Sequence, residues 1–313
     1  MSEFAKLSNE LIKKFVNSNP KHTNTLILSI YGDTICPYGG TLWLGYLIKL
    51  VEPLGINKRL VRTSVYRLSE KGIMSSKKVG RKSFYSLTES GYRQYQSAVK
   101  RIYVTKPPSW DGRWRIVITS IGSLDPKQRE VIEKELIWIG FNRLANGIHI
   151  HPTADIEVVK HILAELKINT QVVSLYATDP SSNTSDQLLK NCFNLNFMDK
   201  AYQDFVNAYE PILNAARQSI NKDEPLDSQL CFLVRTLLIN QFRIILLHEP
   251  ELPIELLSEN SQTIRARQIL SELYLLLWQN ADEYFIQIAK PEKQRNFKEF
   301  RAYYQRFGSL VGD

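Results

Sequence analysis

Apolar residues in the N-terminal third of the chain recur with helical spacing in short, separated segments. Residues 6–18 (KLSNELIKKFVNS) and 25–33 (TLILSIYGD) each predict a helix, with a proline break between them and a CPYGG turn afterwards. Residues 41–55 (TLWLGYLIKLVEPLG) predict a third helix, with Thr41 as its expected N-cap. Its apolar side chains fall at i, i+3, i+4 and i+7, namely Leu44, Leu47, Ile48 and Val51.

A further amphipathic helix and a hairpin follow this segment. Residues 58–71 lie between a capping Asn57 and a terminating Gly72, with an apolar stripe of Leu60, Val61, Val65 and Leu68. Two helices joined by a short Gly-containing turn are typical of a helix-turn-helix. Residues 73–79 and 82–88 alternate polar and apolar side chains around a Gly-Arg tip, which predicts a β-hairpin. This order of elements predicts a winged helix, followed by one more helix that Thr88 is expected to cap.

The remaining two thirds of the chain change character twice. Strand and helix patterns alternate first, with strands expected at 113–121, 146–152 and 169–177 and helices at 125–141 and 154–168. Such an alternation suits a small ferredoxin-like α/β domain. A polar linker is expected at 178–187, and long helices are expected at 200–220, 227–248 and 261–290. The predicted fold is therefore α+β, with a winged helix-turn-helix in 1–106, a ferredoxin-like central domain in 108–178 and a helical C-terminal domain in 188–313.

Positive charge is concentrated at the N-terminal end. Residues 1–107 contain 18 Lys and Arg against 6 Asp and Glu, whereas residues 108–313 contain 22 against 26. A basic module joined to a near-neutral body is typical of a polyanion-binding head on a sensing or assembling trunk. A solubility bias without functional meaning is the alternative.

Most candidate binding residues lie on the predicted second helix and the hairpin. In a helix-turn-helix the N-terminal half of the second helix enters the major groove, where Arg62 and Thr63 are best placed for base edges. Lys58, Arg59 and Arg67 are expected to hold phosphates, and Arg81 could enter the minor groove. The full predicted DNA-binding set is Lys58, Arg59, Arg62, Thr63, Tyr66, Arg67, Lys77, Lys78, Arg81 and Lys82. A solvated basic helix on a protein-binding fold is the alternative.

No motif predicts an enzyme or a metal site. The glycines at 39, 40 and 45 form neither GxGxxG nor a phosphate-binding loop. His149 and His151 are two apart on a predicted strand, so both point to one face and could ligate a metal. Without a second ligand pair at fixed spacing, this pattern favours a polar strand face. No catalytic residue is predicted.

Neither secretion nor membrane insertion is expected. No apolar run approaches the roughly 20 residues needed to span a bilayer, and the first 20 residues lack the pattern of a signal peptide. Cys36, Cys192 and Cys231 form no CxxC pair, which argues for a reducing compartment and against disulfides or a zinc site. The expected location is cytoplasmic.

Several stretches resemble the PaaX family: YGD at 31–33, residues 40–74 and GRKSFYSLTESG at 80–91. The resemblance continues in WDGRWRIV and NGIHIHP, which match the family's Cas2-like middle domain, and in ELPIELL at 251–257, which matches its helical C-terminal domain. Members repress phenylacetate degradation and are released from DNA by phenylacetyl-coenzyme A. The resemblance implies a homodimeric repressor that needs no cofactor and has a double-stranded DNA operator and an acyl-CoA effector as partners.

Some positions depart from the family pattern. HEPELP and SENSQTIRAR stand where the family usually has Asp-Pro before and a Trp-Pro-Gly-like element after the Leu-Pro element, and His149 and His151 replace common Trp and Arg. Cas2-like nucleases place a metal-binding Asp at the end of the first strand, where this chain has Ser120. A hydroxyl cannot replace an anionic ligand for a hard cation, so a nuclease is disfavoured. A ligand-independent DNA- or protein-binding adaptor remains the main alternative.

For the acyl-CoA effector that the resemblance implies, a site is predicted from the chemistry of the ligand. Coenzyme A phosphates require Arg or Lys, adenine requires an aromatic face, and a phenyl group requires an apolar pocket. The residues that offer such groups near a predicted domain junction are Trp110, Arg113, Trp114 and Arg115. Core aromatic residues accompanied by solvated arginines are the alternative.

Overall fold

The computed structural model describes residues 1–18, 23–104, 109–168, 171–178, 182–193, 195–247, 252–257, 262–289 and 301–310. The chain forms two compact units. The first comprises Met1–Thr105, Gln203–Leu247 and Arg265–Asp313, and the second comprises Lys106–Tyr202 and His248–Ile264. The predicted winged helix and most of the predicted helical domain therefore pack together in one unit. The boundaries of three domains along the sequence stay a prediction.

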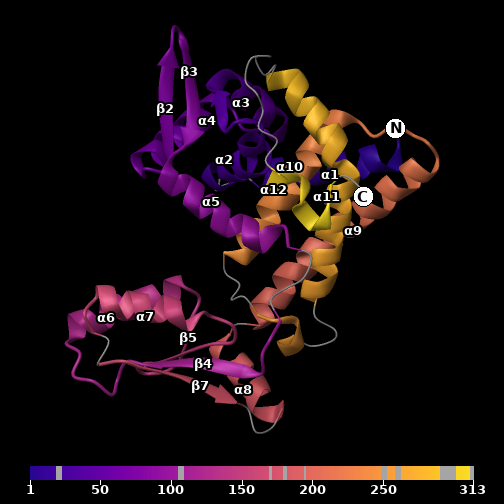
Figure 1. Ribbon diagram of the computed structural model, residues 1–313. Helices are drawn as coiled ribbons and strands as arrows, with labels where there is room; N and C mark the ends of the chain where they lie inside the picture. The colour runs from indigo at the N-terminus through magenta and orange to yellow at the C-terminus, as the bar shows by residue number, and fades with distance from the viewer. Residues whose placement is uncertain are drawn as a thin grey trace. The chain divides into compact units, whose positions relative to one another are not determined.

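The first unit contains the winged helix. Its elements, in order, are α1 (Glu3–Asn17), α2 (Thr23–Ile30), the π-helical turn η1 (Tyr31–Ile35), η2 (Cys36–Tyr38), β1 (Thr41–Trp43), α3 (Leu44–Val51), η3 (Glu52–Leu54), α4 (Lys58–Glu70), β2 (Met74–Val79), β3 (Lys82–Leu87) and α5 (Glu89–Ile102). The strands pair antiparallel in the order β1-β3-β2. The β2–β3 hairpin, called the wing below, projects from the helices in Figure 1. The predicted helix-turn-helix and wing are confirmed.

Local capping explains where two of these helices begin. The Asn57 side chain accepts the Leu60 N–H at 2.9 Å, and Thr88 caps α5 in the same way, as predicted. The expected cap at Thr41 is wrong. Thr41 instead begins β1 and pairs with Ser86 of β3, and α3 begins three residues later, after Trp43, without a side-chain cap.

Long C-terminal helices complete the first unit. They are α9 (Leu195–Asn221) from Gln203 onward, α10 (Ser228–Leu246) and α11 (Gln262–Ala289) from Arg265 onward, followed by the short α12 (Arg301–Tyr304) and η5 (Arg306–Gly308). Helix α10 packs against α1, α2 and α5 and forms the centre of the core. By length and composition α10 could cross a membrane, but 72% of its most apolar stretch is buried inside the fold, as in the core helix of a soluble protein.

The second unit has a ferredoxin-like topology, as predicted. Its elements are β4 (Arg113–Ile118), α6 (Pro126–Trp138), β5 (Asn142–Ala145), β6 (Ile148–His151), α7 (Ile156–Glu165) and β7 (Val173–Thr178), in an antiparallel sheet of order β5-β6-β4-β7. Strand β5 was not predicted, because its four residues (NRLA) contain no β-branched or aromatic side chain.

Two hydrophobic cores lie on opposite faces of this sheet. Helices α6 and α7 supply one core, together with Val117. The other contains Trp114, Leu189, Phe193 and Leu252. Leu189 belongs to α8 (Ser182–Cys192), so the linker expected at 178–187 is wrong for its described part from 182 onward, where the chain is already helical. Residues 252–257, including η4 (Ile254–Leu256), belong to this unit rather than to the helices of the first.

Candidate nucleic-acid interface

Helix α4 buries one face and exposes the other. Val61, Ser64, Val65 and Leu68 are buried and follow the i, i+3, i+4, i+7 pattern, on a helix that packs against α2. Leu60 was expected in this stripe but is 42% exposed, whereas Ser64 is buried. The opposite face exposes all six predicted α4 residues: Lys58, Arg59, Arg62, Thr63, Tyr66 and Arg67.

The wing adds a second exposed basic surface. Gly80 adopts the left-handed conformation that the tight tip requires, with φ +57°. Lys77, Lys78, Arg81 and Lys82 are all exposed around it. The Lys82 ammonium lies 4.8 Å from the centre of the Trp43 ring, so β1 helps to orient this side of the wing.

Within the described part of the chain, these basic side chains have no internal counter-ions. Among the described residues, no Asp or Glu forms an ion pair with any of the eight Lys and Arg residues on α4 and the wing. Thr63 donates its hydroxyl to the Arg59 carbonyl at 3.0 Å and otherwise stays exposed. An uncompensated positive surface is what a polyanion such as a DNA backbone would neutralise. Direct contact of these residues with DNA stays a prediction.

Lys58→Ala is expected to weaken binding to specific and random DNA about equally, because an exposed cation at the start of α4 is placed for a phosphate. The slope of log K against log salt should become shallower by about one unit. Anisotropy titrations at several salt concentrations measure this slope. An unchanged slope would remove Lys58 from the phosphate contacts.

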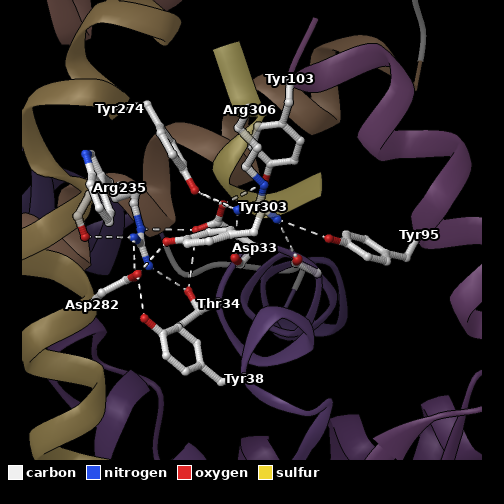
Figure 2. Close-up of polar contacts among 12 residues, drawn as sticks. Asp33, Thr34, Tyr38, Tyr95, Tyr103, Arg235, Tyr274, Asp282, Tyr303 and Arg306 are labelled. Carbon is white, nitrogen blue, oxygen red and sulfur yellow. Dashed lines mark hydrogen bonds and ion pairs between the residues drawn. The ribbon is translucent and has the colours of Figure 1, made fainter. Parts of the chain in front are cut away.

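A buried charge cluster lies behind the winged helix, within the first unit. It consists of Asp33, Arg235, Asp282 and Arg306, each at most 4% exposed (Figure 2). Arg235 of α10 contacts Asp33 at 3.1 Å and Asp282 of α11 at 2.7 Å. Arg306 of η5 contacts the Asp33 carboxylate at 3.0 Å. The two cations and two anions balance, which is the condition for keeping charges in a dry interior.

Tyrosines satisfy the remaining oxygen atoms of the cluster. Tyr103 and Tyr274 donate to Asp33 Oδ1 at 2.6 and 3.0 Å, and Tyr38 and Tyr303 donate to Asp282 Oδ2. Burial raises the pKa of each of these phenols above its usual value, so they remain donors at neutral pH. Burial alone would lower the pKa of Arg235, but Asp282 and Asp33 hold it well above its usual value.

The YGD sequence at 31–33 connects this cluster to the wing. The Tyr31 hydroxyl donates to the Tyr85 carbonyl of β3 at 3.1 Å, and Asp33 forms ion pairs with both arginines. Gly32 lies so close to the ring of Tyr95 that a Cβ atom at this position would stand 2.6 Å from a ring carbon. Sequence reasoning missed the cluster; a charged Arg235 inside the apolar run CFLVRTLLI was the available signal.

Gly32→Ala is expected to destabilise the first unit by about 1–3 kcal/mol, since the added methyl overlaps the Tyr95 ring. Urea unfolding of the variant and of Gly32→Ala combined with Tyr95→Leu measures this effect. The two changes should be less than additive, because Leu removes the overlapping ring. Full additivity would contradict the overlap.

The four predicted effector residues do not share one face of the second unit. Trp114 is 1% exposed, donates its indole N–H to Ser185 at 3.2 Å and packs edge-on to Trp110. Arg113 and Arg115 lie on the other face of β4, where both pair with Asp111 and stack over Tyr176. Their part in effector binding stays a prediction.

The two strand histidines share one face of the sheet, as predicted, but that face is buried. His151 accepts the backbone N–H of Thr153 and Ala154, whereas neither ring nitrogen of His149 has a partner among the described residues. Burial lowers the pKa of His149 below its usual value. Ser120 is exposed just beyond β4, and no three His, Cys, Asp or Glu residues of the described chain group as metal ligands would.

The fold defines a winged-helix protein in which α4 and the wing carry an exposed basic surface, joined to a ferredoxin-like unit. The chain belongs to the PaaX family: residues 22–91 match PaaX-like protein, 107–189 the PaaX protein central Cas2-like domain and 193–287 the PaaX-like protein C-terminal domain. It is 30% identical over 306 residues to the transcriptional repressor PaaX of Escherichia coli (strain K12), covering 96% of this chain and 94% of that protein.

A solved structure is also similar. The uncharacterized protein Rv0674 from Mycobacterium tuberculosis is 18% identical, with a TM-score of 0.46 over 76% of this chain and 89% of that chain.

Proposed function

We propose that the protein is a cytoplasmic transcriptional repressor that binds double-stranded operator DNA through α4 and the wing. The observation that carries this proposal is the exposed face of α4, on an element whose opposite face is anchored in the core. Its four basic side chains have no counter-ion among the residues that the structure describes. The wing extends the same charge. Similarity to a transcriptional repressor over nearly the whole chain supports the role.

The regulated genes and the effector follow from the family rather than from the site. The proposal is that the operator controls a phenylacetate catabolic operon and that phenylacetyl-CoA releases the protein from it. A homodimer would present two winged helices to half-sites one helical turn apart, about 34–36 Å, or a multiple of it. The effector must prefer the DNA-incompetent state tens to hundreds of fold, a coupling of about 2–3 kcal/mol.

A fluorescence-anisotropy titration tests this function. DNA from upstream of the protein's own gene and the neighbouring operon is compared with random DNA, with and without phenylacetyl-CoA. The expected result is tight, sequence-selective binding that the thioester reverses and free phenylacetate does not. Selective binding that ignores the thioester would keep the DNA-binding role and reject the effector. Equal binding to all fragments would support the adaptor alternative.

A further inference from the structure

The side chain of Arg306 makes several of the contacts that hold the C-terminal segment 301–310 in the first unit. Arg306 is 3% exposed and donates to two backbone carbonyls of η1, those of Gly32 and Asp33, at 3.2 and 2.9 Å. It also donates to the hydroxyls of Tyr95 and Tyr274, at 3.1 and 2.7 Å (Figure 2). These partners belong to η1, α5 and α11, so the guanidinium of Arg306 joins three parts of the unit.

Aromatic rings complete the site around Arg306. The guanidinium carbon lies 4.0 Å from the centre of the Tyr103 ring and 4.6 Å from that of Tyr303. The next residue, Phe307, adopts a left-handed conformation with φ +52° and donates its N–H to the Tyr103 carbonyl at 3.1 Å. A planar group with five donors fits these partners, whereas a lysine ammonium has three donors and no plane to stack.

The turn η1, whose carbonyls accept hydrogen bonds from Arg306, also contacts the elements proposed to bind DNA. Within η1, Tyr31 donates to β3 of the wing, two residues before the Asp33 that Arg306 contacts. η1 continues α2 directly, and α2 packs against α4. η1 is therefore linked to the wing by a hydrogen bond and to α4 through α2.

We infer that Arg306 is a positioning residue for DNA recognition: it fixes η1, and through η1 the relative placement of α4 and the wing. This inference rests on the proposed DNA-binding function. Arg306 itself is buried and cannot touch DNA. The C-terminal segment 301–310 thus supports the winged helix from within the unit. Its detachment would loosen the surface formed by α4 and the wing without removing any side chain from that surface.

Removal of Arg306 takes one cation from the buried cluster and should destabilise the first unit, as the loss of Asp33 would. Asp33 would keep its contact with Arg235 and the hydroxyls of Tyr103 and Tyr274, so no carboxylate is left without a partner. What is lost is the link between η1, α5 and α11. In the protein that remains folded, the DNA-binding side chains are all still present, and the expected change is in the precision of their placement.

The test compares Arg306→Ala and Arg306→Lys with Arg217→Ala, which removes an exposed ion pair with Glu272 in the same unit. For Arg306→Ala, affinity for selected operator DNA should fall roughly tenfold, the size of one lost specific contact, with a smaller loss on random DNA. Arg306→Lys should recover little of it, and Arg217→Ala should bind as the parent does. Added methylguanidinium should restore, in Arg306→Ala, the ratio of the affinity for operator DNA to that for random DNA. Sodium chloride at equal ionic strength is the control for salt, and the parent protein is measured under both salts.

Hydrogen exchange supplies a readout that needs no DNA. In Arg306→Ala, amide protection should fall in η1 and β3 while that of the second unit is unchanged, and methylguanidinium should restore it. A folded Arg306→Ala protein with parental specificity and parental protection of η1 would overturn the inference. If the alanine variant does not fold, parental values of both readouts in Arg306→Lys would overturn it equally. A parent protein that selects no DNA sequence would instead reject the proposed function, and the exchange result would still decide whether Arg306 holds η1.

Discussion

Replacing Asp33 with alanine is expected to lower the free energy of unfolding of the first unit by about 3–5 kcal/mol, the usual cost of removing one partner from a buried ion pair. Asp33 is 2% exposed and is the anion that Arg235 and Arg306 share. Its loss would leave two buried guanidinium groups with Asp282 as the only carboxylate of the cluster. Two tyrosine hydroxyls would lose their acceptor as well.

A matched control lies in the second unit. Asp111 also pairs with two arginines, Arg113 and Arg115, but its side chain is 35% exposed. Asp111→Ala is therefore expected to cost only about 0–1 kcal/mol, because solvent screens the half-exposed Arg113 and Arg115 keeps the carbonyl oxygens of Ala154 and Pro152 as acceptors. Urea unfolding followed by circular dichroism, with hydrogen exchange to assign the loss to its unit, measures both. Equal losses for the two variants would show that burial does not set the importance of the Asp33 contacts.

The regular spacing of apolar residues was enough to predict the main helices and strands from the sequence. Helix α4 and the wing follow patterns that local spacing, an Asn cap and a Gly-Arg tip already specify. Thr41 was misassigned because β1 exists only through its pairing with β3, a tertiary contact that outweighs local capping preference. Helix α8 was missed because its polar first turns resemble a linker, while its stability comes from Leu189 packing in the core with Trp114.

The buried cluster illustrates a different limit. Asp33, Arg235 and Arg306 lie far apart in the sequence, and no local pattern pairs them. A charged residue within the apolar stretch of α10 implies a buried partner but not which residue it is. The exposed residues of α4, in contrast, could be selected directly, since a helical period of 3.6 fixes which side chains face away from the core. The exposed face of α4 was therefore predictable, and the contacts that hold this helix in place were not.

Arg62→Ala is expected to reduce the discrimination between operator and random DNA by about 1–3 kcal/mol, which is the usual contribution of one bidentate arginine–guanine contact. Arg62 lies on the exposed face of α4, one turn from its N-terminal end, where a recognition helix meets base edges. It forms no ion pair with any described residue, so the guanidinium is free to turn toward a base. The fold should be unaffected, because the neighbouring Val61 and Val65 supply the buried contacts.

Arg93→Ala is the matched control for charge. Arg93 is an exposed arginine of the same winged helix but lies on α5, where it pairs with Glu89 at 2.8 Å. Anisotropy titrations on operator and random DNA at one salt concentration give the ratio of affinities for each protein. Arg62→Ala should lower this ratio, while Arg93→Ala should leave it unchanged. An equal loss on both DNAs in Arg62→Ala would place Arg62 on a phosphate, and base reading would then have to come from Thr63, Tyr66 or the wing.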